Sequence, residues 1–129
     1  MTQPVRITGG AVVEFVAMRY GVSPEALAGP RRANPLTRAR QFAMYAMRLL
    51  CPHLSYPAIG RLLGGRDHTT ILHGCRKVEA LIDQGEFKED LAHLSEWFDR
   101  AYLASQIQET EQRLASLKAI QAQLLQVPA

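Results

Sequence analysis

Two short amphipathic segments separated by a pair of glycines constrain the fold more than any other feature of this 129-residue chain. The first segment begins at Ser55, and the second runs from Asp67 to about Ile82, each with apolar residues at helical spacing. Gly64 and Gly65 stand between them, and glycine permits the sharp backbone turn that ends one helix before another begins. Because two helices joined by a turn of about four residues form a helix-turn-helix, the segment predicts that motif.

The second helix of this predicted motif has two distinct faces. One narrow face is apolar and is formed by Ile71, Cys75, Val78 and Ile82. The opposite face is polar and carries Thr69, His73 and Arg76, with Lys77 on its flank. We expect the apolar face to pack into a core and the polar face to meet a ligand.

The rest of the chain also shows helical spacing and no β-alternation, so the predicted fold class is all-α. Ser23 is expected to cap a short helix that has Pro24 in its first turn and ends at residue 29. Thr37 is expected to cap the next helix, over residues 38–50, and to follow a basic loop, PRRANPLT. Further helices are expected over residues 10–20 and 87–127.

Charge is distributed unevenly along the chain, although its net value is only +3. Residues 1–82 contain eleven Lys or Arg and four Asp or Glu, whereas residues 83–129 contain four and eight. Between Arg31 and Lys77 there are nine basic residues and one acid, Asp67. This excess is larger than solubility requires, and it favours a polyanionic partner.

Targeting signals are not apparent in the sequence. No apolar run approaches the roughly 20 residues of a membrane span, and the segment MTQPVRITGG lacks the apolar core of a secretory signal. We therefore expect a cytoplasmic protein without membrane contact. In that compartment Cys51 and Cys75 are expected to be reduced and partly buried.

The cluster GGRDHTT lies where the second helix of the motif begins. Asp67 is placed to cap that helix, and Thr69 and Thr70 stand at its positive end, which favours a phosphate. In a helix-turn-helix the first residues of the second helix contact base edges in the major groove. Asp can accept a hydrogen bond from cytosine and Thr can contact thymine, so the cluster predicts recognition of double-stranded DNA.

The segment from Ala39 to Leu81, ARQFAMYAMRLL to GGRDHTTILHGCRKVEAL, closely resembles the C-terminal DNA-binding domain (domain IV) of the bacterial replication initiator DnaA. The resemblance extends more loosely over residues 8–90. It implies an all-helical, Trp-repressor-like fold and binding to a short TTATNCACA-like box. It also implies base contacts from Asp67, His68 and Thr69, with Arg38 in the neighbouring minor groove.

Contacts with the DNA backbone are expected from a second group of residues. The resemblance implies such contacts for Arg48, Arg66 and Thr70. The basic loop adds Arg32, the helix over residues 38–50 adds Arg40, and the polar helix face adds His73, Arg76 and Lys77. For Arg40 and for the basic loop a solvated surface role fits the sequence equally well.

The chain departs from the initiator in two respects. No GxxxxGK[ST] loop is present, so we expect a stand-alone DNA-binding protein with no ATPase activity and no cofactor. Residues 1–90 are expected to form the DNA-binding domain, and residues 91–129 form an extension that the resemblance does not cover. The expected role is regulation of replication initiation or transcription at the nucleoid.

Metal binding and catalysis are the two alternatives for the polar cluster. His73 and Cys75 are two residues apart on a helix, so they point about 200° apart and cannot chelate one ion together. Adjacent Asp67 and His68 do not form a catalytic relay, and no nucleophile motif accompanies them. We therefore expect no metal site and no catalytic residue.

The C-terminal extension carries a broken aliphatic stripe, formed by Leu103, Ile107, Leu114, Leu117 and Leu124. Three imperfect heptads are marginal for a free coiled coil. Packing against the domain and formation of a homodimer fit the stripe equally well, and Trp97 and Phe98 suit either. An alternative function is an interaction module in which these helices bind a replication protein and DNA contact is secondary.

Overall fold

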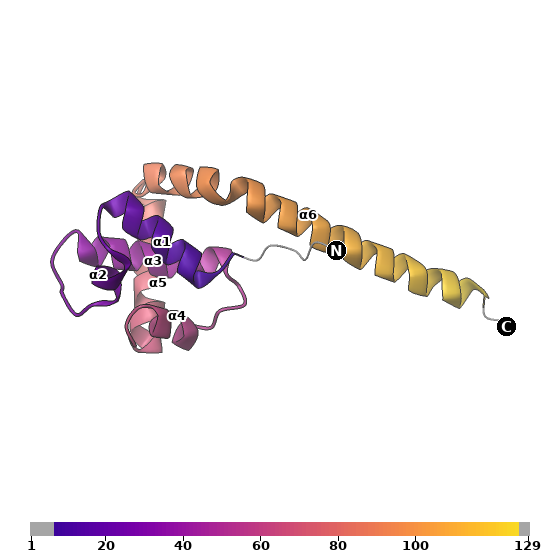
Figure 1. The fold of residues 1–129 in the computed structure, drawn as a ribbon, viewed down its shortest axis with the longest axis horizontal. Helices are drawn as coiled ribbons and strands as arrows, with labels where there is room; N and C mark the ends of the chain where they lie inside the picture. Colours follow the sequence, from indigo (N-terminus) through magenta and orange to yellow (C-terminus); the bar gives the residue numbers. More distant parts are fainter. Residues whose placement is uncertain (1–6, 127–129) are drawn as a thin grey trace.

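A computed structural model describes the backbone of residues 7–126 and the side chains of this range except those of residues 99–103 and 106. Over this range the chain forms six helices and no strand, which confirms the predicted all-α fold. The helices are α1 (Gly9–Tyr20), α2 (Pro24–Ala28), α3 (Leu36–Leu50), α4 (Tyr56–Leu62), α5 (His68–Asp83) and α6 (Lys88–Gln126). Helices α1–α5 gather into a rounded bundle, and α6 leaves it as one long rod (Figure 1).

Local capping residues determine where several helices begin. The hydroxyls of Ser23 and Ser55 accept hydrogen bonds from backbone N–H groups in the first turns of α2 and α4, at 3.0 and 3.2 Å. Asp67 caps α5 in the same way, so these three predicted caps are confirmed.

The predicted cap at Thr37 is wrong. Helix α3 begins two residues earlier than expected, at Leu36, and its N-cap position is held by Pro35, which makes no side-chain cap. Thr37 therefore lies within the first turn of α3, where its hydroxyl donates to the Arg32 carbonyl at 2.9 Å. This bond joins the basic loop, residues 29–35, to the helix that follows it.

Helix α3 is the centre of the bundle and packs against α1, α2, α4 and α5. Its inward face is fully buried and consists of Ala39, Phe42, Ala43, Ala46 and Met47. Helix α5 crosses α3 at Gly74, where a Cβ atom would lie 2.3 Å from the Met44 sulfur. The absence of a side chain at Gly74 therefore permits the close approach that places α5 on the bundle.

The turn between α4 and α5 depends on glycine at three positions. Gly64 and Gly65 have φ values of +81° and +80°, a region that other residues adopt at a cost. The backbone N–H groups of Gly65 and Arg66 both donate to the Gly60 carbonyl at 2.9 Å. A Cβ on Gly60 would lie 2.0 Å from the Arg66 carbonyl oxygen. The predicted helix-turn-helix is confirmed, and its turn is tightly packed.

Arg40 lies inside the bundle, with only 4% of its surface exposed. Its guanidinium donates to the carbonyls of Leu27 at 2.7 Å and of Ala26 and Gly29 at 2.8 Å, and also to that of Arg31. The end of α2 and the basic loop thus occupy four of the five N–H donors of Arg40, which disfavours the expected contact of Arg40 with the DNA backbone. A buried cation is tolerated here because carbonyl oxygens replace its water.

Helix α6 is anchored to the bundle at its first turn. Phe87, which precedes it, is 4% exposed and stacks on Phe42 with ring centroids 5.3 Å apart. Its φ of +64° is unfavourable for a non-glycine residue, and the burial of its ring offsets that cost. An ion pair between Arg19 and Asp90, with N and O atoms 2.6 Å apart, ties the same turn to α1.

The core continues into α6 beyond the expected domain boundary. Leu94 and Phe98 belong to the buried cluster, and the Phe98 ring contacts Phe15 edge-on at 5.8 Å. The expected division between residues 90 and 91 therefore falls inside a continuous helix whose first three turns pack on the bundle. The start of the extension thus packs against the domain, one of the two arrangements that the sequence left open.

The outer half of α6 has a different environment. Every residue from 111 to 126 is exposed, including Leu114, Leu117 and Leu124 of the predicted stripe, and Ile107 of that stripe is exposed as well. The side chain of Leu103, which belongs to that stripe, lies outside the described residues. Among the helices described, none combines the length and the apolar character that a membrane span needs.

Substitution of each turn glycine by alanine tests how closely the turn packs against α2. Gly65→Ala places a Cβ in open space, so we expect only the left-handed backbone penalty, about 1 kcal/mol of unfolding free energy. Gly64→Ala adds a clash, because its Cβ would lie 1.9 Å from the Ala28 carbonyl oxygen. We expect a loss of about 3 kcal/mol from urea unfolding curves for this variant. Equal losses would contradict the close packing of the turn against α2.

The buried guanidinium generates a second prediction. Arg40→Lys keeps the charge but cannot reach the four carbonyls with three donors on one nitrogen, so we expect a loss of about 3 kcal/mol in unfolding free energy. Arg32→Lys, an exposed change on the same loop, is the control and should cost less than about 0.5 kcal/mol. If both variants were equally stable, Arg40 would not hold the loop.

Candidate nucleic-acid interface

The exposed N-terminus of α5 carries a connected polar cluster. The Asp67 carboxylate accepts a hydrogen bond from the backbone N–H of Thr69 at 3.3 Å and another from the Thr69 hydroxyl. The ring Nδ1 of His68 lies 3.2 Å from the other carboxylate oxygen, and the Asp67 and His68 side chains are 62% and 60% exposed. The three predicted base-contacting residues therefore stand together on the solvent side of the helix end.

Hydrogen bonding keeps the Asp67 carboxylate ionised. The Thr69 hydroxyl is the largest cause of a lowered Asp67 pKa, and the backbone N–H of Thr69 adds to it. Because the folded pKa lies below the unfolded one, this cap stabilises α5 above the unfolded pKa. The contribution is lost as the pH falls through the folded pKa. At neutral pH the carboxylate can only accept hydrogen bonds, which suits an exocyclic amino group on a base.

The two faces of α5 follow the prediction, except that Ile82 of the apolar face is only half-buried. Ile71, Cys75 and Val78 are at most 2% exposed, and burial raises the pKa of the Cys75 thiol to about 11. The outward face exposes Thr70, His73, Arg76 and Lys77. Cys51 and Cys75 are free and buried, and within the described residues no three His, Cys, Asp or Glu side chains lie close enough to hold a metal ion.

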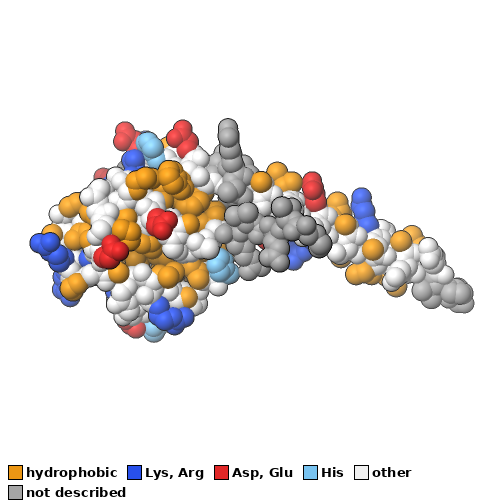
Figure 2. Space-filling view, viewed as in Figure 1, with side chains coloured by type: hydrophobic (Ala, Val, Ile, Leu, Met, Phe, Trp, Pro, Cys, Tyr) orange, Lys and Arg blue, Asp and Glu red, His pale blue; other side chains and the backbone are white. Residues whose placement is uncertain are grey.

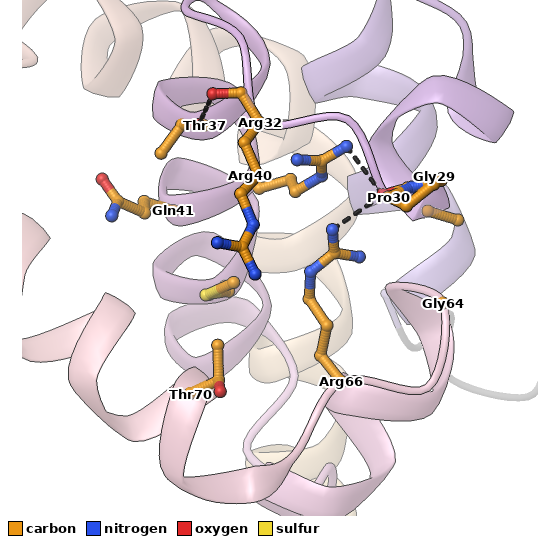
Figure 3. Close-up of a pocket in the computed structure, with 11 residues that line it drawn as sticks. Gly29, Pro30, Arg32, Thr37, Arg40, Gln41, Gly64, Arg66 and Thr70 are labelled. Carbon is orange, nitrogen blue, oxygen red and sulfur yellow. Dashed lines mark hydrogen bonds between the residues drawn. The ribbon is translucent and has the colours of Figure 1, made fainter.

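A basic groove of about 570 Å³ lies between the basic loop and α5 (Figure 3). The polar side chains that line it come from the loop, from α3, from the glycine turn and from the start of α5: Arg32, Thr37, Arg40, Gln41, Arg66 and Thr70. Three guanidinium groups converge there, two of them bonded to the Gly29 carbonyl, from Arg40 at 2.8 Å and from Arg66 at 2.7 Å. The groove thus concentrates positive charge beside the N-terminus of α5.

The electrostatics of this groove favour an anion. Burial lowers the pKa of both Arg40 and Arg66, and a neighbouring guanidinium lowers each further: Arg66 acts on Arg40, and Arg32 acts on Arg66. Both causes penalise uncompensated positive charge. An anion in the groove would offset this repulsion.

Arg38 lies next to this groove. A second groove, of about 380 Å³, is lined by Arg38 and Lys77 and shares Thr37 and Gln41 with the first. Arg38 donates to Glu86 at 2.8 Å, and its guanidinium lies 4.0 Å from the Phe87 ring centroid. The bond with Glu86 is the main reason for a raised Arg38 pKa. The structure therefore brings Arg38, Lys77 and the basic groove onto one continuous surface.

Arg48 lies elsewhere, at the C-terminal end of α3. Its guanidinium donates to the Leu54 carbonyl at 3.1 Å and lies 4.8 Å from the ring centroid of Tyr56, the first residue of α4. Arg48 remains exposed, so it is oriented without being enclosed. Sequence reasoning missed the partners that hold these arginines, Glu86, Phe87 and Tyr56, because each is distant in sequence or lacks a local motif.

Comparison with known proteins covers the same region. A family model described as the bacterial dnaA protein helix-turn-helix matches residues 10–78. The chain is 45% identical over 80 residues to the chromosomal replication initiator protein DnaA of Rhizobium johnstonii. It is 48% identical over 71 residues to the protein of the same name from Agrobacterium fabrum, and 44% identical over 77 residues to that from Cereibacter sphaeroides. These segments cover 62%, 55% and 60% of this chain.

The same segments cover only 16%, 14% and 17% of the three relatives, so the chain spans about a sixth of their length. The family match includes the basic loop, α2–α4, the glycine turn and most of α5, and it leaves out α6. It extends over more than half of the chain and contains the helix-turn-helix whose geometry is described above. This chain belongs to the bacterial dnaA protein helix-turn-helix family.

Proposed function

We propose that this chain binds double-stranded DNA specifically at DnaA-box-like sequences through α5 and the adjoining basic surface. The observation that carries the proposal is the exposed cluster of Asp67, His68 and Thr69 at the N-terminus of α5, beside a groove with three guanidinium groups. The N-terminal residues of the second helix are those that contact base edges in this motif. The relatives are chromosomal replication initiators, which supports the same ligand class for this chain.

The proposed contacts fall into two groups. Asp67, His68 and Thr69 contact bases in the major groove, and Arg38 contacts the neighbouring minor groove. The phosphate backbone is contacted by Arg32, Arg48, Arg66, Thr70, His73, Arg76 and Lys77. Arg40 is not in either group; it acts on binding only by holding the loop that carries Arg32.

The proposed biological role is regulation of replication initiation or transcription by occupation of such boxes at the nucleoid, in the cytoplasm. We propose that it requires no nucleotide, because these 129 residues contain no phosphate-binding GxxxxGK[ST] loop. The bundle, which extends into α6 as far as Phe98, is proposed to contact DNA. The outer half of α6 is proposed to associate with other chains.

A second candidate function is protein association through α6. The observation that favours it is the aliphatic surface that the outer half of this helix exposes. A second copy of the chain and a replication protein are the two partners expected. The self-complementary pattern of that surface favours the second copy.

The proposed base contacts predict a loss of specificity without a loss of folding. We expect His68→Ala and Thr69→Ala each to weaken binding to the preferred box by about 1–3 kcal/mol, with much less effect on scrambled duplex. Asp67→Asn keeps a capping oxygen and should stay folded while it changes base preference. The measurement is competition between the two duplexes, with helical circular dichroism as the folding check. Folded variants with full specificity would contradict the base contacts.

Arg48→Ala provides the contrasting variant. If Arg48 contacts a phosphate, its loss should weaken all sequences alike and reduce the log–log salt slope by about one unit. A change in which base is preferred, with an unchanged slope, would instead place Arg48 at a base edge.

The ion pair of Arg38 predicts a gain in affinity. Arg38 and Glu86 are 42% and 49% exposed, so their ion pair contributes little stability, and Glu86 competes with DNA for the guanidinium. We expect Glu86→Gln to raise box affinity about two- to fivefold at low salt. Glu89→Gln removes the same charge from the first turn of α6 and is the matched control. Equal gains in the two variants would indicate a general charge effect and not release of Arg38.

A further inference from the structure

The outer half of α6 presents an aliphatic surface that nothing in the bundle covers. Six large residues there are between 51% and 80% exposed: Ile107, Leu114, Leu117, Ile120, Leu124 and Leu125. Apolar side chains are visible along this part of the rod (Figure 2). So long an aliphatic stripe on a solvated helix is typical of an interaction surface and not of scattered exposed residues.

The stripe follows a heptad repeat. Ile107 and Leu114 occupy successive a positions, and Leu117 and Leu124 occupy successive d positions. The remaining positions of the seam are polar, with Thr110 at d and Gln121 at a. A seam of this kind fits another helix of similar length, and the spacing of 3.5 residues is that of a left-handed coiled coil.

We propose that the partner is a second copy of α6 in the antiparallel orientation. An antiparallel pair matches each a residue with a d residue of the other copy. One register pairs Leu114 with Leu117, Ile107 with Leu124 and Gln121 with Thr110, each pair formed twice by symmetry. Every aliphatic residue of the seam then meets another, and the two polar residues meet each other.

Charge distinguishes this orientation from the parallel one. In the antiparallel register Glu111 lies beside Lys118 of the second copy, and this attractive pair forms twice. In a parallel dimer the residues that flank the seam would be Arg113 and Lys118, so two cations would be apposed twice. Neither Glu111 nor Lys118 has a charged residue three or four positions away on its own helix, so both are available to a partner.

The flanking apolar residues agree with the same register. Leu125 lies beside Ala104 of the second copy, and Ile120 lies beside the methylene groups of Arg113. Ala104 and Arg113, which these side chains would cover, are exposed in the single chain. The antiparallel pair therefore shields the remaining aliphatic surface as well as the seam.

This arrangement separates the two DNA-binding bundles. The midpoint of the pairing lies between residues 115 and 116, roughly 18 residues from Phe98, where the core ends, so the two attachment points are about 50 Å apart. The dimer then presents one box-binding surface at each end, a consequence that rests on the proposed function. It would then hold two duplex segments at once, in contrast to helix-turn-helix dimers that place both recognition helices on adjacent turns of one site.

The test uses sedimentation equilibrium of the full chain without DNA, so that it is independent of the proposed function. Lys118→Glu places a carboxylate beside Glu111 in the antiparallel dimer, and we expect the dimer Kd to rise about tenfold at low salt. In a parallel dimer the carboxylate that this variant introduces would instead pair with Arg113 and lower the Kd. The double variant Glu111→Lys with Lys118→Glu should restore the original Kd. Ala119→Glu, on the outward face, is the control and should leave it unchanged.

Small-angle scattering supplies an independent measure of orientation. The antiparallel dimer should show a second maximum in its distance distribution, at about 50 Å or beyond, from two separated bundles. A monomer at every concentration, or a Kd that falls in Lys118→Glu, would overturn the proposal. A dimer that fails to bind any box would overturn the proposed function alone, whereas a box-binding monomer would overturn this inference alone.

Discussion

A single buried guanidinium holds together the part of the molecule that faces the proposed ligand. Arg40 extends from the central helix α3 and donates to four carbonyl oxygens at the end of α2 and in the basic loop. Two of those carbonyls belong to the last turn of α2 and two follow it, and all would otherwise need water or other donors. The loop carries Arg32, and its Gly29 carbonyl also receives Arg66 from the glycine turn. Loop, central helix and turn are therefore joined at one site, and the groove exists because of it.

Glycines in the turn and in α5 allow neighbouring elements to pack closely in the same region. Gly64 brings the turn against the end of α2, and Gly74 brings α5 against α3. In both places the space for a Cβ is filled by an atom of the neighbouring element. Helix α5 is thus positioned by the approach of Gly74 to the Met44 side chain and by the approach of Gly64 to the Ala28 carbonyl.

Local patterns explain what could be predicted from the sequence. Helix spacing, the caps at Ser23, Ser55 and Asp67, and the glycine turn all depend on neighbouring residues, and these predictions are confirmed. The family match to residues 10–78 confirms the resemblance on which the site assignment rests, whereas the individual contacts remain proposals. The burial of Arg40 could not be predicted, because its carbonyl partners lie 9 to 14 residues away and leave no motif. The continuation of the core to Phe98 was missed for a similar reason, since Phe15 is its distant partner.

Phe87 has a consequence for how α6 is joined to the bundle. Its ring stacks on Phe42 in the core and supports the Arg38 guanidinium, and its left-handed backbone sets the direction in which α6 departs. Any displacement of this ring would therefore remove contacts from the core, from Arg38 and from the start of α6 together. One aromatic residue at a helix junction thus joins the core, a basic side chain and the long helix.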